Sequence, residues 1–188
     1  MERVYIYTDE SNDLHGGVLS IAGLALTDHV WAVRNKLLKV EGQSGKGSRD
    51  WHKTKEVRTR VRYLELVVQI EELTGCLFFQ THAHSTNSFD ATVETLSNAI
   101  LEFGGGRQCI AIHEGFTRST RLKLQKALRA VQQNVEVRAG SIKNEPRVRL
   151  ADSLAGFCRL MHSDSARKGA YDGLDYEAWL LALGVPNC

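Results

Sequence analysis

Strand-like and helix-like patterns alternate along this chain, and their order constrains the fold more strongly than any other feature. Two β-branched and aromatic runs, 4–8 and 18–26, flank the turn-rich segment SNDLHGG and predict a β-hairpin. Further along the chain, three more strand patterns each precede an amphipathic helical pattern. This order predicts an α/β sandwich with a mixed central sheet flanked by helices, in which the N-terminal hairpin is antiparallel and the later strands are parallel.

Apolar residues at helical spacing place the helices of this fold. Two helices are expected between the hairpin and the third strand, and one helix is expected after each later strand. Asn87 or Ser88 opens the third helix, and glycines mark several helix ends. The expected segments are helices at 28–42, 54–75, 88–103, 122–131 and 146–161, strands at 76–84, 108–116 and 134–140, and a short closing helix from about residue 176.

The composition is that of one folded domain. Of the 188 residues, 43% are hydrophobic and 24% are charged, so we expect a single domain over 1–188. No apolar run is long enough for a membrane span, and the first residues lack the pattern of an export signal. The four cysteines lie without CxxC spacing, which favours reduced thiols and hence a cytoplasmic protein.

Positive charge is concentrated in two segments, although the net charge is only +2. Between 118 and 149 there are nine Lys and Arg residues and two acids, a balance of +7; between 46 and 62 there are seven and two, a balance of +5. Such segments bind polyanions, although helices also carry basic residues on ordinary solvated faces. The glycine-containing segment 42–53 is expected to be a mobile basic loop. The candidate substrate-binding residues are Lys53, Lys55, Arg121, Lys126 and Arg149.

Acidic residues end two of the predicted strands, and another lies on the last long helix. Asp9 and Glu10 end the first strand, Glu114 ends a later strand, and Asp152 flanks the apolar stripe of its helix. Crevices form at the carboxyl ends of parallel strands, and a half-buried carboxylate needs a cation or a pairing partner. Asp9, Glu114 and Asp152 are therefore candidate ligands for Mg²⁺ or Mn²⁺, which activate water for phosphodiester hydrolysis. Each acid also has an ordinary alternative role in a turn, in solvent or in an ion pair.

Four segments together resemble the domain-of-unknown-function family numbered 3800. They are YIYTDESND near the start, WHKTK after the basic loop, CIAIHEGF at a strand end, and SIKNEPRVRLADSLAGF late in the chain. The resemblance spans most of the chain and implies a ribonuclease H-like fold and metal-dependent nuclease activity, as found among mobile-element and phage-defence genes. Two positions depart from the family pattern. Asn12 stands in place of a glycine, and Arg149 stands in place of a glutamine one helical turn before Asp152, where its charge competes with a metal for that carboxylate.

The resemblance also implies roles for particular residues. Because neighbouring strand residues point to opposite faces, Asp9 and Glu10 both reach one site only if the strand breaks between them. Lys53 and Lys143 are expected to contact phosphate, and His52 either moves a proton or hydrogen-bonds a phosphate. The implied catalytic residues are Asp9, Glu10, Glu114, Asp152, His52 and Lys143, and the implied metal ligands are Asp9, Glu114 and Asp152.

These features favour a nuclease that uses Mg²⁺ or Mn²⁺ and acts on DNA or RNA. The sequence is also compatible with a protein partner or with a homo-oligomer. The main alternative is a non-catalytic nucleic-acid-binding protein on the same fold, in which Arg149 neutralises Asp152 and basic helices bind the polymer. A phosphohydrolase of nucleotides or other small molecules would use the same acids without needing both basic segments. Trp51, which lies in the basic loop, is a candidate for stacking on a base.

Overall fold

A computed structural model of the protein describes residues 2–12, 18–27, 29–83 and 86–163. Within these ranges a strand pair is followed by two α-helices, a short 3₁₀ helix and three strand–helix pairs. The elements are β1 (Arg3–Asn12), β2 (Val18–Leu26), α1 (Val30–Ser44), α2 (Val57–Val67), η1 (Glu71–Leu73), β3 (Leu77–Ala83), α3 (Ser88–Phe103), β4 (Gln108–His113), α4 (Arg118–Val131), β5 (Val135–Ala139) and α5 (Pro146–Ser163).

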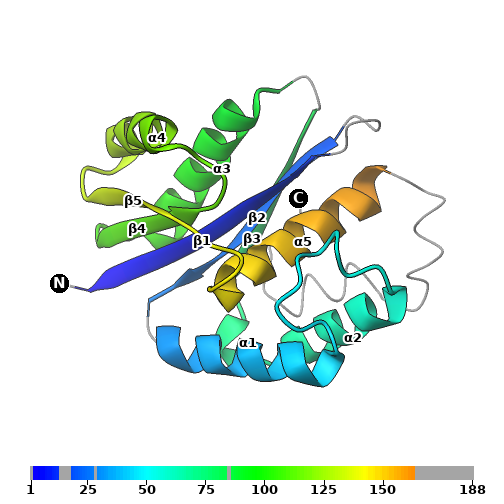
Figure 1. Ribbon diagram of the computed structural model, residues 1–188. Helices are drawn as coiled ribbons and strands as arrows, with labels where there is room; N and C mark the ends of the chain where they lie inside the picture. The colour runs from blue at the N-terminus through cyan, green and yellow to red at the C-terminus, as the bar shows by residue number, and fades with distance from the viewer. Residues whose placement is uncertain (1, 13–17, 28, 84–85, 164–188) are drawn as a thin grey trace.

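The strands form one mixed sheet in the order β3-β2-β1-β4-β5 (Figure 1). β2 is antiparallel to both β1 and β3, and Asp9 lies opposite Ala22. β1, β4 and β5 are parallel, with Thr8 beside His113 and His113 beside Ala139. The predicted mixed sheet, its antiparallel hairpin and the parallel pairing of β4 and β5 are confirmed, whereas β3, also expected among the parallel strands, pairs antiparallel with β2. The carboxyl ends of β1, β4 and β5 therefore lie together at one edge of the sheet.

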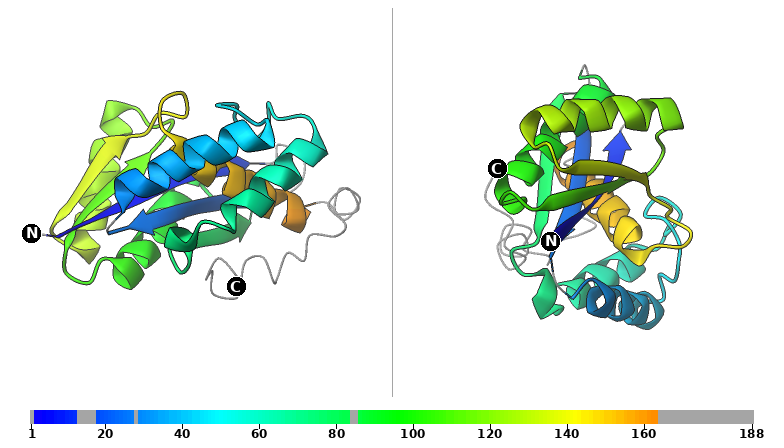
Figure 2. Two further views of the ribbon diagram at one scale, coloured as in Figure 1. Left: turned by 90° about the horizontal axis from the view of Figure 1, so that it is seen from below. Right: turned by 90° about the vertical axis from the view of Figure 1, so that its left-hand side faces the viewer.

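Helices cover both faces of the sheet (Figure 2). α1, α2 and α5 lie on one face, and α3 and α4 lie on the other. Side chains of β1 alternate between the two faces of the sheet. Tyr7 packs in the apolar core beneath α5, and Ile6 packs in the core beneath α3 and α4. This alternation decides which face each residue near the end of β1 can reach.

Side chains of α4 cover the outer edge of β5. Oε1 of Gln125 accepts a 2.9 Å hydrogen bond from the backbone N–H of Val137. Nε of Arg129 donates a 3.0 Å hydrogen bond to the carbonyl oxygen of Val135. Both backbone groups point away from β4, so a helix satisfies groups that a further strand would otherwise bind.

A buried histidine lies in the core beneath α3. His113 is 1% exposed, its Nδ1 lies 3.1 Å from the hydroxyl oxygen of Thr8, and its ring centroid lies 4.4 Å from that of Phe116. Burial lowers the pKa of His113 to about 4. The imidazole is therefore neutral at pH 7 and serves as a packing group on the face opposite α5.

Several details differ from the sequence prediction. α1 continues beyond Gly42 to Ser44 and ends where Gly45 adopts a positive φ of 76°. The helix expected over 54–75 is divided into α2 and η1. Trp31, which helical spacing grouped with apolar positions, is 72% exposed. The closing helix expected from residue 176 lies outside the described residues. Among the helices that are described, none combines the length and the apolar character needed to cross a membrane.

Candidate active site

Two aspartates lie close together where α5 crosses β1. Asp9 lies near the carboxyl end of β1, and strand alternation places it on the same face as Tyr7, toward α5. Asp9 is buried and Asp152, on α5, is half-buried. Burial raises the pKa of Asp9 well above its usual range, and the negative charge of Asp152 raises it further. The two carboxylates therefore share one electrostatic environment.

Glu114 joins this pair from the adjacent strand. It directly follows β4 and shares its face with Ile112, toward α5. Its Oε2 accepts a 2.8 Å hydrogen bond from the backbone N–H of Ile142, in the turn before α5. The charge of Glu114 also raises the pKa of Asp9, although less than burial and Asp152 do. The three acids proposed from sequence as metal ligands thus gather at one edge of the sheet.

A loop from far upstream in the chain holds Asp152. The backbone N–H of Trp51 donates a 2.6 Å hydrogen bond to Oδ2 of Asp152. Burial raises the pKa of Asp152, whereas this hydrogen bond and the positive charges of Lys46 and His52 lower it. Burial is the largest of these effects, so the pKa of Asp152 stays above its ordinary value.

The side chain of Trp51 anchors this loop in the core. Trp51 is 3% exposed, its ring meets Phe157 edge to face with centroids 6.3 Å apart, and the guanidinium of Arg60 lies 4.6 Å from its ring centroid. Gly156 makes room for the ring, because a Cβ at that position would lie only 2.1 Å from Cδ1 of Trp51. This burial contradicts the expectation that Trp51 stacks on a nucleotide base.

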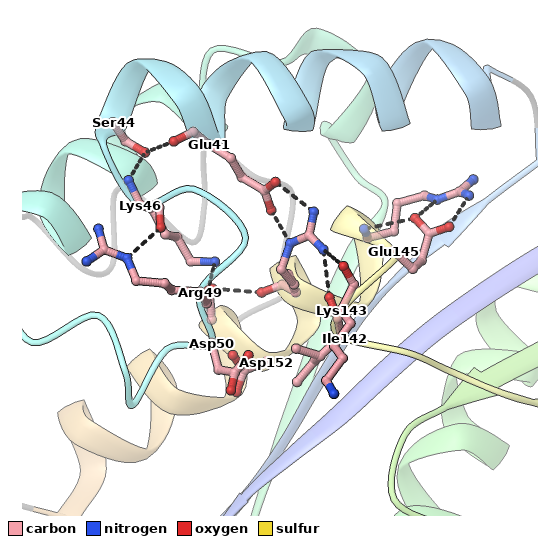
Figure 3. Close-up of polar contacts among 12 residues, drawn as sticks. Glu41, Ser44, Lys46, Arg49, Asp50, Ile142, Lys143, Glu145 and Asp152 are labelled. Carbon is pink, nitrogen blue, oxygen red and sulfur yellow. Dashed lines mark hydrogen bonds and ion pairs between the residues drawn. The ribbon is translucent and has the colours of Figure 1, made fainter.

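Lys46 lies at the centre of the same loop (Figure 3) and is completely buried. Its Nζ donates a 2.6 Å hydrogen bond to the carbonyl oxygen of Arg49 and lies 4.8 Å from the ring centroid of Tyr63. Burial lowers the pKa of Lys46 to about 8, although neighbouring carboxylates oppose this effect. Of the segment 42–53, expected to be a mobile loop, the first three residues end α1, and the remainder is held by internal hydrogen bonds and several buried side chains.

Arg149 lies inside the fold and not at a substrate surface. It is 2% exposed, and its Nε and Nη2 donate hydrogen bonds of 2.6 and 2.7 Å to the carboxylate of Glu41 on α1 (Figure 3). Its Nη1 donates to the carbonyl oxygens of Ile142 and Lys143, at 2.6 and 3.2 Å. The expectations that Arg149 binds substrate and competes for Asp152 are corrected, because Glu41 balances its charge. Arg149 instead ties α5 to α1 and to the turn that precedes α5.

Asp50 is an acidic neighbour that sequence analysis missed. It is buried, lies beside Asp152 (Figure 3) and forms an ion pair with Lys53. Its negative charge contributes to the raised pKa of Asp152. The only signal in the sequence is its place directly before the segment WHKTK, within a run dominated by basic residues.

Glu10 does not join the acidic group. β1 runs unbroken to Asn12, so Glu10 lies on the face opposite Asp9. There its carboxylate accepts a hydrogen bond from the hydroxyl of Ser88, at the start of α3. The condition for Glu10 to share the site, a break in the strand after Asp9, is not met.

The other residues selected from sequence lie at or near the surface, in two places. His52 and Lys53 follow Trp51, beside Asp152, and Lys143 follows Ile142, whose N–H binds Glu114. The backbone of these three residues therefore lies next to the acids. Others lie farther from the acids, on α4 or before α2. Of these candidate residues, Arg121 is half-buried, and the exposed ones are His52, Lys53, Lys55, Lys126 and Lys143.

The three carboxylates suit a hard divalent cation by their chemistry. Among the residues that the structure describes, no three His, Cys, Asp or Glu side chains converge closely enough to hold a metal ion. Glu114 and Asp152 each use one oxygen for a backbone N–H and retain another. The repulsion that raises the pKa of Asp9 is the effect that a bound cation relieves. The type of donor atom, oxygen throughout, therefore fits Mg²⁺ or Mn²⁺, whereas the spacing of the three carboxylates would have to shorten around the ion.

Comparison with known proteins identifies the fold. No protein-family profile and no curated protein sequence matches this chain. RNase HII in its complex with PCNA, from Archaeoglobus fulgidus, is 15% identical, with a TM-score of 0.56, and the match covers 100% of this chain and 93% of that one. Ribonuclease H2 from Pyrococcus horikoshii OT3 is 12% identical, with a TM-score of 0.51 and coverage of 83% and 72%. The chain has the ribonuclease H-like fold that the family resemblance implied.

Proposed function

We propose that the protein is a metal-dependent nuclease that hydrolyses phosphodiester bonds in DNA or RNA. The observation that carries this proposal is the gathering of Asp9, Glu114 and Asp152 at the carboxyl edge of the parallel strands, where their charges repel. A divalent cation would relieve that repulsion and meet only oxygen ligands. Further support comes from the fold, because the similar solved structures are ribonucleases.

The acids would hold the metal, and the backbone would hold the acids. When bound, Mg²⁺ or Mn²⁺ supplies an activated water and charge stabilisation for the leaving oxygen of a phosphodiester. The N–H groups of Trp51 and Ile142 fix the carboxylates of Asp152 and Glu114. Asp9 lies within the sheet, so the rigid strand β1 orients it. These contacts limit the positions that the ligand oxygens can take.

Basic residues around the acids would bind the substrate. Lys53 and Lys143 would contact phosphate oxygens beside the bond that is cut, and His52 would hydrogen-bond a phosphate or deliver a proton to the leaving oxygen. Lys55 and Lys126 would add positive charge along the rest of the polymer. The alternative of a non-catalytic protein loses one support, since Arg149 pairs with Glu41 and leaves Asp152 without the expected neutralising partner.

The biological setting follows from resemblance and is part of the same proposal. Similarity to the domain family 3800 points to phage defence or mobile-element functions. One similar structure is a complex of RNase HII with PCNA, so a protein partner also belongs to the proposal. The first substrates to test are therefore polymers that contain RNA, alongside DNA.

The decisive experiment is a cleavage assay on end-labelled single-stranded and double-stranded DNA and RNA and on an RNA–DNA hybrid. Each polymer is incubated with Mg²⁺, Mn²⁺ or EDTA. The variants are Asp9→Asn and Asp152→Asn, and the matched control is Asp90→Asn, which changes an exposed acid on α3. We expect cleavage with a divalent metal by the wild type and the control, and none by the two site variants.

Two results would overturn this proposal. One is cleavage that persists in EDTA or in the Asp9→Asn variant. The other is a wild-type protein that binds these polymers and cuts none of them with either metal. The second result would favour the non-catalytic nucleic-acid-binding protein.

A further inference from the structure

A groove between α4 and β5 lies apart from the three acids. It encloses about 250 Å³, and its basic lining consists of Arg118 and Arg121 from α4 and Arg138 from β5. Leu122, Gln125 and Val137 also line it. No carboxylate is among the described residues that form its wall. The charged side chains that line the groove are therefore all basic.

Much of this charge is not used by the fold. Arg138 donates hydrogen bonds of 2.7 and 3.0 Å to the carboxylate of Glu136, so its charge is largely balanced. Arg118 and Arg121, by contrast, form no ion pair with any acid in the described part of the chain. Arg118 is exposed and Arg121 is half-buried. Two guanidinium groups are thus free to bind an anion in the groove.

The groove is held in shape by other residues. Leu124 and Leu128 are completely buried and fix α4 on the sheet. Gln125 bonds the backbone of Val137 at the wall of the groove, which fixes the spacing of α4 and β5. The two unpaired arginines are therefore not required for packing, and an anion would enter a preformed space.

The groove begins at the same sheet edge as the acidic site. His113, the last residue of β4, lies beside Ala139 in the parallel pairing of β4 and β5, and Glu114 directly follows it. Arg118 begins α4 only four positions after Glu114. Because β5 is the strand next to β4, a polymer that crosses the ends of β1 and β4 next meets the end of β5, where Ala139 lines the groove.

We propose that this groove binds backbone phosphates of the nucleic-acid substrate, away from the bond that is cut. The inference rests on the proposed function, because it names a second part of the surface for the same substrate. Guanidinium groups bind phosphate through paired N–H donors, and they do so regardless of base sequence. The subsite therefore fixes the position of the polymer and does not select its sequence.

The test measures binding without catalysis. Fluorescence anisotropy follows a fluorescein-labelled single-stranded RNA of about 16 nucleotides, in EDTA, with KCl raised from about 50 to 200 mM. The variant is Arg118→Ala with Arg121→Ala. The matched control is Lys39→Ala with Lys123→Ala, which also removes two exposed positive charges but from outside the groove.

The expected result is a loss of affinity of about tenfold or more in the arginine variant, with a much smaller loss in the control. The slope of log affinity against log salt should become shallower by about 1.4, since two phosphate contacts on a single strand are lost. Arg118→Lys combined with Arg121→Lys should recover the salt slope, because both positive charges are kept, and should recover only part of the affinity.

Other outcomes separate this inference from the proposed nuclease activity. If Arg118→Ala with Arg121→Ala binds RNA as tightly as the Lys39→Ala, Lys123→Ala control does, the proposed phosphate subsite is overturned, even if the wild type cleaves RNA. A selective loss of binding in a protein that cuts no polymer supports the subsite and contradicts the nuclease. Polyglutamate and unlabelled RNA are also compared as competitors at equal total charge. If polyglutamate displaces the labelled RNA as readily as unlabelled RNA does, the groove binds anions in general, and its assignment to backbone phosphates is overturned.

Discussion

The backbone N–H of Trp51 donates a 2.6 Å hydrogen bond to Oδ2 of Asp152, although 101 positions separate the two residues in the sequence. The bond joins a loop after α1 to an acid on α5. Gly156, on the next turn of α5, leaves space for the Trp51 ring. The position of the Asp152 carboxylate therefore depends on how the loop packs as well as on α5 itself.

Replacement of Asp9 by asparagine should stabilise the metal-free protein at pH 7. The pKa of Asp9 is raised in the fold, so its contribution to stability is lost as pH rises from the usual aspartate pKa through the raised value. The asparagine side chain carries no charge and avoids that loss. We expect a gain of about 1 kcal/mol, or a Tm higher by about 2–4 °C, in calorimetry with EDTA.

The same calorimetry tests the metal site. Mg²⁺ or Mn²⁺ at about 100 times its Kd should add about 2.7 kcal/mol to wild-type stability. Asp9→Asn should lose most of this increment, whereas Asp90→Asn should retain it. A Tm for Asp9→Asn below that of the wild type in EDTA would mean that Asp9 is not strained by its neighbours.

Substitution of alanine for Gly156 should displace the Trp51 loop. The new Cβ would overlap the indole ring, so we expect a loss of about 1–3 kcal/mol in urea unfolding and a changed tryptophan emission spectrum. Gly42→Ala is the matched control, since nothing lies within 4 Å of a Cβ there, and it should gain about 0.5–1 kcal/mol because glycine weakens a helix. Equal effects of the two substitutions would argue against close packing at Gly156.

Loss of Arg149 should affect folding more than nucleic-acid binding. Arg149→Met leaves Glu41 buried without its partner, and we expect a cost of about 3–5 kcal/mol in urea unfolding. Adding Glu41→Leu should recover most of that loss. Arg121→Ala should change stability by less than about 0.5 kcal/mol. If Arg149→Met is as stable as the wild type but binds RNA more weakly, the structural role is contradicted, and Arg149 is a substrate-binding residue.

His113 should make the protein less stable in acid. The pKa of His113 falls to about 4 in the fold, so its contribution is complete above the unfolded value of 6.5 and is lost as pH falls toward 4. This difference corresponds to as much as about 3 kcal/mol. His113→Gln should flatten the dependence of the urea midpoint on pH between 4 and 6.5. An unchanged pH dependence in His113→Gln would contradict a lowered pKa of this imidazole in the fold.

The sheet and two of its acids follow from local patterns. α3 begins at Ser88 and ends at Phe103, as expected, because Asn87 caps its start and a glycine follows its end. Asp9 and Glu114 are recognisable because each follows an apolar run of residues, Asp9 near the carboxyl end of β1 and Glu114 directly after β4, and parallel strands bring their carboxyl ends together. Strand alternation also supplies the condition that separates Glu10 from Asp9.

The buried polar contacts around Asp152 do not follow from local patterns. Arg149 meets Glu41 across 108 positions, and a charged residue within a basic run is expected to be exposed until its partner is known. Lys46 and Trp51 lie in a glycine-containing polar segment, whose composition is typical of a loose loop. Their burial depends on α2 and α5, which fold around that segment.

The hydrogen bonds from Gln125 and Arg129 to the outer backbone of β5 also affect whether two molecules of this protein can associate through the edges of their sheets. An uncovered edge strand is a template on which other chains add strands, and repeated addition leads to fibrils. At Val135 and Val137 that template is already occupied by the protein's own helix. A second molecule that approaches this side meets arginine side chains in place of an open backbone, which favours reversible charged contacts over aggregation.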